Sequence, residues 1–106
     1  MPEISELYLS THFRERWRER VGGEPKVSAV RKLINESVYL QQCQMLRLHS
    51  GGFFCMPGIY WHPEKNIIIK LDEIEKVAIT VLSPRCIMEE WEADGIERPV
   101  FKSTGR

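Results

Sequence analysis

Apolar residues recur every three or four positions near the start of the chain, and this spacing predicts an amphipathic helix over residues 11–21. The apolar stripe of this helix consists of Leu9, Phe13, Trp17 and Val21. The pair Gly22-Gly23 follows, and glycine favours the left-handed conformation that ends many helices. The same helical spacing over residues 25–37 predicts a second helix. The short connection between the two helices predicts a hairpin or a corner.

After residue 38 the helical spacing stops, and alternating or continuous apolar segments predict strands instead. We expect them over 42–48, over 53–61 as one strand bent at Pro57-Gly58 or as two short strands, over 67–71 and over 77–82. Short connections between strands favour antiparallel neighbours. Ser83-Pro84 then predicts the start of a short third helix that ends near residue 95. The predicted fold is α+β, with two N-terminal helices packed on a four-stranded antiparallel sheet and a short C-terminal helix.

The length of 106 residues predicts one domain over 1–106, with a core at about 8–93 and an extended tail at 96–106. The helical and strand patterns predict the buried side chains Phe13, Trp17, Val30, Leu33, Ile34, Ile68, Ile79 and Val81. An apolar content of 42% is ordinary for a soluble protein. No apolar run approaches the length of a membrane span, and residues 1–6 do not read as a signal peptide. We therefore expect a cytoplasmic protein with no membrane contact.

The three cysteines Cys43, Cys55 and Cys86 are widely spaced and include no C-x-x-C pair. We interpret them as small buried apolar residues, the usual role of unpaired cysteines. A zinc site built from Cys55 and His62 is the alternative, although this spacing matches no standard motif. The sequence predicts neither a metal site nor a cofactor site.

Charge is distributed unevenly along a chain whose formal net charge is zero. Residues 12–34 hold seven Lys or Arg against three Glu, whereas residues 72–97 hold eight Asp or Glu against two Lys or Arg. Zero net charge argues against a protein dominated by nucleic-acid binding. The basic and acidic segments could pair within one molecule or between two subunits, so a homodimer is one expectation.

A second stripe of the first helix places His12, Arg16 and Arg20 in a row, because residues four apart share a helix face. Arginine donates bidentate hydrogen bonds to phosphate, and the positive end of a helix dipole favours anions near His12. The row therefore suits phosphate. The alternative is that His12 packs locally while the arginines pair with Glu19 or with the acidic segment.

The helix motif His12-x-x-x-Arg16-x-x-x-Arg20, the element order and the strand segment Ile79-Thr80-Val81-Leu82 together resemble the RelE/BrnT-like toxin superfamily. The resemblance covers residues 8–83 and is greatest to a branch with this first helix. It implies a RelE-like fold and a metal-independent ribonuclease of a prokaryotic toxin–antitoxin or mobile-element system. It also implies RNA as substrate and a cognate antitoxin as partner. This chain departs from typical members, which are strongly basic.

Metal-free RNA cleavage needs an acid, a base and cations that offset the charge developing on phosphorus. The expected catalytic residues are His12, Arg16, Arg20 and Thr80, with His12 as the group that transfers protons. The expected RNA-binding residues are Tyr60, Trp61 and Arg85, the aromatic pair by stacking on bases. The alternatives are a locally bonded Thr80 and aromatic rings that pack in the core. At the level of function, the alternatives are a non-catalytic module of the same fold that binds a protein or a nucleic acid, and a structural member of the family with no site.

Overall fold

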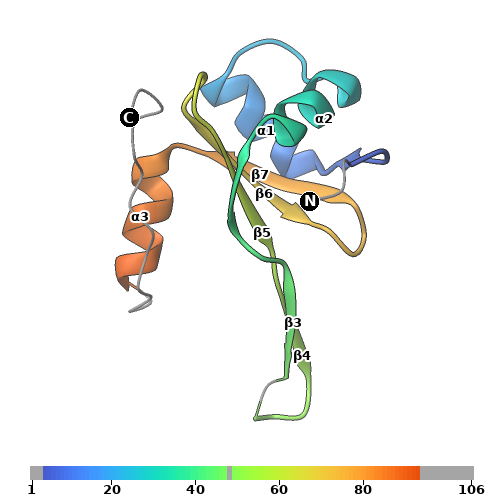
Figure 1. The fold of residues 1–106 in the computed structure, drawn as a ribbon, viewed down its shortest axis with the longest axis vertical. Coiled ribbons are helices and arrows are strands. Elements are labelled where there is room, and N and C mark those ends of the chain that lie inside the picture. Colours follow the sequence, from blue (N-terminus) through green and yellow to red (C-terminus); the bar gives the residue numbers. More distant parts are fainter. Residues whose placement is uncertain (1–3, 48, 94–106) are drawn as a thin grey trace.

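The computed structural model describes residues 4–47 and 49–93 (Figure 1). The helices are α1 (Thr11–Arg20), α2 (Val27–Asn35) and α3 (Pro84–Ala93). The strands are β1 (Tyr8–Leu9), β2 (Val38–Gln41), β3 (Gln44–Arg47), β4 (Phe53–Met56), β5 (Gly58–His62), β6 (Ile67–Asp72) and β7 (Val77–Leu82). The α+β class and the order of the predicted helices are confirmed. The predicted tail at 96–106 lies outside the described residues.

The first helix begins and ends where the sequence predicts. Ser10 is its N-cap, and the Ser10 hydroxyl accepts the Phe13 N–H at 2.9 Å, as serine does at many helix starts. The same hydroxyl donates to the Ile79 carbonyl at 3.0 Å, which ties the start of α1 to β7. Gly22 and Gly23 follow with φ values of +98° and +74°, a conformation in which other residues are strained.

The main sheet differs from the predicted antiparallel meander. It has five strands in the order β1-β7-β6-β5-β2, and β1 pairs with β7 in parallel while the other neighbours are antiparallel. Two residues of β1 are too few for a periodic pattern, so sequence analysis missed this strand. The strand predicted over 42–48 contains β3, but sequence analysis missed β2, which precedes it and is separated from it by two residues outside any strand.

Helices α1 and α2 lie on one face of the sheet (Figure 1). Beneath them is a core cluster that includes Phe13, Trp17, Val30, Ile34 and Val81. Helix α3 packs on the other face through Ile87, which joins Ile59, Trp61 and Ile68 in a second cluster. Strand β6 therefore has buried side chains on both faces, as its continuous apolar sequence predicts.

All predicted core residues except Ile79 are buried. Lys70 pairs with Thr80 and Leu71 pairs with Ala78, so Ile79 is the extra residue of a β-bulge. In a bulge the extra residue is unpaired, and its side chain no longer follows the regular alternation between the two faces of the sheet. Ile79 is consequently only half-buried.

Strands β3 and β4 form a separate two-stranded hairpin that projects away from the sheet (Figure 1). We call residues 44–56 the arm. The base of the arm is held by a hydrogen bond from the Gln41 side chain to the Pro57 carbonyl at 3.0 Å. The Tyr39 hydroxyl accepts the Cys43 N–H at 3.2 Å and donates to the Glu73 carboxylate at 2.5 Å. These contacts fix the direction in which the arm leaves the body.

Among the residues that the structure describes, no helix has both the length and the apolar character of a membrane span.

Candidate nucleic-acid interface on helix α1

The residues His12, Arg16 and Arg20 lie in a row on α1, on the face that adjoins its buried residues. His12 and Arg20 are exposed and Arg16 is half-buried. The neighbouring face of the helix buries Phe13 and Trp17, whose rings lie 5.8 Å apart between centroids. Packing against the sheet therefore presents the row to solvent.

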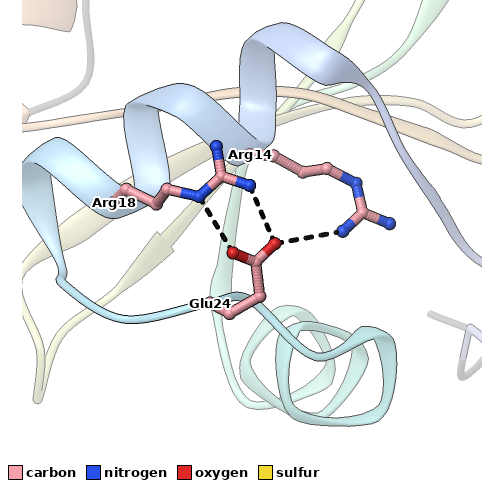
Figure 2. Close-up of polar contacts among 3 residues, drawn as sticks. All are labelled: Arg14, Arg18 and Glu24. Atoms are coloured by element: carbon pink, nitrogen blue, oxygen red, sulfur yellow. Dashed lines mark hydrogen bonds and ion pairs between the residues drawn. The ribbon is translucent and has the colours of Figure 1, made fainter.

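The four arginines of α1 are partnered differently. Arg16 Nη1 donates to both carboxylate oxygens of Glu19 at 2.9 Å, within the same helix. On the other side of α1, Arg18 forms a two-point contact with the Glu24 carboxylate at 2.9 Å, and Arg14 approaches the same carboxylate at 3.6 Å (Figure 2). The hydrogen bond from Arg18 lowers the pKa of Glu24, and the same bond raises the pKa of Arg18.

All the ion pairs that α1 makes with described side chains therefore use Glu19 or Glu24. Neither glutamate belongs to the acidic segment 72–97, so that segment does not neutralise α1 within the described part of the chain. None of the described side chains forms an ion pair with Arg20. Ion pairs as exposed as that between Arg16 and Glu19 contribute little to stability and exchange readily with other anions.

The end of α1 lies close to the start of α3. The pKa of the Cys86 thiol is lowered mainly by its hydrogen bond with the Ser83 hydroxyl, at 3.2 Å, and also by the nearby charge of Arg20. Arg85 precedes Cys86, is highly exposed, and forms an ion pair with Glu89 at 3.4 Å. Arg85 therefore belongs to the part of α3 that lies near Arg20.

Thr80 is not brought to the row on α1. It pairs with Lys70 in the sheet, on the opposite face from Val81, which belongs to the core under the N-terminal helices. Thr80 is buried, and its hydroxyl has no hydrogen-bond partner among the described residues. The sheet thus separates this hydroxyl from His12, and the expected shared catalytic site does not fit this placement.

Tyr60 and Trp61 are also buried, contrary to a role in stacking on bases. Tyr60 is fully buried against the Tyr39 ring at 4.8 Å between centroids, and burial is the main reason that its pKa is raised. Trp61 is 8% exposed and its indole N–H donates to the Asn66 side chain at 3.1 Å. Stacking on bases needs an exposed ring face, whereas these two rings pack in the core on the two faces of the sheet.

A pocket that sequence analysis did not find lies between α1, α2 and the turn after β5. Its volume is about 550 Å³, and its walls include Trp17, Leu33, Glu36 and His62. His62 Nδ1 accepts the Lys65 N–H at 3.1 Å, so the proton sits on Nε2 and is donated to Glu36 at 3.1 Å. Both ring nitrogens of His62 therefore have hydrogen-bond partners within the fold. Glu36 and His62 are far apart in sequence, and no local pattern pairs them.

Comparisons of this chain with protein-family models, with curated proteins and with solved structures gave no match.

Proposed function

We propose that this protein binds RNA through the phosphate backbone along the row His12, Arg16 and Arg20 of α1. The observation that carries the proposal is the absence of any covering carboxylate from the sheet or the acidic segment among the described side chains. The resemblance of the helix motif to RelE/BrnT-like proteins supports the same surface and the same ligand.

The chemistry of the row suits phosphate in three ways. Arg20 offers a guanidinium with no ion-pair partner among the described side chains, and Arg16 can exchange its exposed contact with Glu19 for a backbone phosphate. His12 lies in the first turn of α1, where the helix dipole favours anions. With zero net charge on the chain, the complex should be weak near physiological salt and tighter at low salt.

Cleavage of the bound RNA is the second candidate function, and the exposed imidazole of His12 is the observation that favours it. A histidine beside a phosphate-binding arginine can transfer a proton to or from a reacting oxygen near neutral pH. Because Thr80 is buried on the other face, the catalytic set is reduced to His12 with Arg16 and Arg20. This is a sparse set for cleavage, and for that reason we place binding first.

A cognate antitoxin remains part of the proposal, because the resemblance includes toxin–antitoxin systems. A small protein encoded beside this one that co-purifies with it would support such a pairing, and growth arrest on induced expression would support a toxin. Growth arrest that is lost in His12→Ala would favour cleavage over binding alone.

The central experiment measures binding to a fluorescent single-stranded RNA of about 12 nucleotides by anisotropy over a range of salt concentrations. The double variant Arg16→Ala/Arg20→Ala removes two positive charges from the row. The control Arg14→Ala/Arg18→Ala removes the same charge from the other side of α1, where Glu24 already holds both arginines.

If the row binds phosphate, the first variant should lose affinity and the control should lose much less. The salt dependence should also change, because each phosphate contact on single strands contributes about 0.7 to the slope of log K against log salt. Loss of two contacts should reduce the slope by about 1.4. Equal effects of the two variants would indicate a response to net charge and would refute the assignment of the row.

A further inference from the structure

The arm carries a pair of exposed side chains at its tip that no part of the proposed α1 surface uses. Arg47 is the last residue of β3 and Phe53 the first of β4, and the two are directly paired across the hairpin. Directly opposite residues in an antiparallel pair have Cβ atoms about 5 Å apart on the same face. Both residues are exposed, and Phe53 is 66% exposed, more than any other large apolar residue described.

The charge around this pair has a single sign. From residue 37 to residue 63 the chain contains no Asp or Glu, whereas Arg47 and His49 lie on either side of residue 48, at the tip of the arm. None of the described carboxylates forms an ion pair with Arg47. His49 is exposed, as is the turn segment from Ser50 to Gly52 that joins the two strands. The tip therefore combines an exposed aromatic ring with a cation that has no ion-pair partner among the described carboxylates.

We propose that the tip of the arm is a second contact for single-stranded RNA, with a base stacked on Phe53 and the adjoining phosphate held by Arg47. Stacking of bases on aromatic side chains beside cationic groups is the common way in which proteins bind single strands. The proposal rests on the proposed function, since it supplies a second site for the same ligand.

The charge pattern favours RNA over a second copy of this chain as the occupant. Arg47 is the one formally charged side chain of residues 37–63, so a symmetric contact between two arms would bring the two Arg47 guanidinium groups toward each other. RNA is a polyanion, so its phosphates are attracted to Arg47 and not repelled by it. The separate positions of arm and helix also matter, because the arm points away from the body on the side opposite α1 along the longest axis, which extends 41 Å (Figure 1).

Two substitutions at one position separate RNA stacking from apolar contact with a protein. Phe53→Leu keeps an apolar side chain but removes the aromatic face, whereas Phe53→Trp keeps and enlarges that face. Tyr8→Ala is the matched control, because Tyr8 is an equally exposed aromatic residue on β1 of the body, at 61% exposure. Each protein is titrated into the same RNA of about 12 nucleotides at low salt, and its oligomeric state is measured by sedimentation.

Removal of a base–aromatic stack typically lowers affinity by about 5- to 150-fold. We expect a loss in this range for Phe53→Leu, near-normal affinity for Phe53→Trp and for Tyr8→Ala, and an unchanged melting temperature in all three. Arg47→Gln should reduce the slope of log K against log salt by about 0.7. NMR shifts on adding RNA should appear at the arm and at α1 as two separate groups.

The outcomes distinguish this inference from the proposed function. If the α1 double variant loses RNA while Phe53→Leu binds normally, the arm proposal is overturned and the α1 proposal stands. If the wild-type protein binds no RNA at low salt, both are overturned. A further variant, Phe53→Ala, removes the apolar side chain altogether. If Phe53→Leu leaves RNA binding unchanged, and sedimentation shows a wild-type dimer that Phe53→Ala converts to a monomer, the arm is a contact between protein chains and not an RNA site.

Discussion

Gly58 at the start of β5 is a site where one added methyl group should loosen the base of the arm. Gly58 is buried, and a Cβ atom built on it would overlap the carboxylate of Glu73. The same carboxylate accepts the Tyr39 hydroxyl, which in turn accepts the Cys43 N–H at the start of the arm. Gly58→Ala should therefore displace Glu73 and break its bond with Tyr39.

The expected cost is that of a hydrogen bond to a charged group, about 1.5–3 kcal/mol. The backbone itself adds little, because the φ of Gly58 is not positive and alanine can adopt it. The Glu73 carboxylate can move to another rotamer, since the overlap is with the end of a flexible side chain. In that rotamer, however, it no longer accepts the hydrogen bond from the Tyr39 hydroxyl. For a domain of about 100 residues this corresponds to a fall in Tm of about 4–8 °C for each kcal/mol.

Urea unfolding followed by circular dichroism measures this cost directly, and a double-mutant cycle assigns it. In a Tyr39→Phe background the hydrogen bond is already absent, so Gly58→Ala should then cost less than about 0.5 kcal/mol. An equal cost in both backgrounds would refute the reasoning, because the overlap would then be relieved by the strands and not by Glu73. An unchanged Tm for Gly58→Ala alone would refute it as well.

Three further predictions concern the core, the thiol and the proposed site. Trp17→Ala removes a side chain that is 7% exposed and should cost about 3–5 kcal/mol in urea unfolding; cooperative melting within a few degrees of wild type would contradict it. Ser83→Ala removes the main contact that lowers the pKa of Cys86, so the pH profile of Cys86 alkylation, followed by mass spectrometry, should move to higher pH. His12→Ala should lower any metal-independent RNA cleavage by about 10²–10⁴-fold without changing Tm, because His12 is exposed.

Long periodic segments were predictable from the sequence because their spacing reflects burial on one face. The helix at residues 11–20 and the strands near 67–71 and 77–82 appear where their patterns place them. The two-residue β1 was not predictable, because a parallel pairing with β7 depends on residues about seventy positions later. Helix α3 was predicted, but the face of the sheet that it covers follows from packing and not from its own sequence.

The candidate site was predictable only where it lies on one element. The row of His12, Arg16 and Arg20 follows from helical spacing alone, and the structure leaves it at the surface. Thr80 was placed with it by resemblance, and the bulge and the alternation of β7 put its hydroxyl on the other face. The pocket beside His62 and the paired Arg47 and Phe53 depend on contacts between elements, which no single periodic segment reveals.

The Ser10 hydroxyl, which caps α1 and also donates to β7, has a consequence for the order of folding. Its two partners are separated by most of the chain, so α1 receives its final position only after residues 77–82 have left the ribosome. Contacts this distant in sequence form late and slow the folding of small domains. An incomplete nascent chain would therefore contain all the arginines of α1 without the sheet that presents them, and any RNA-binding or RNA-cleaving activity would begin only when synthesis of the domain is nearly finished.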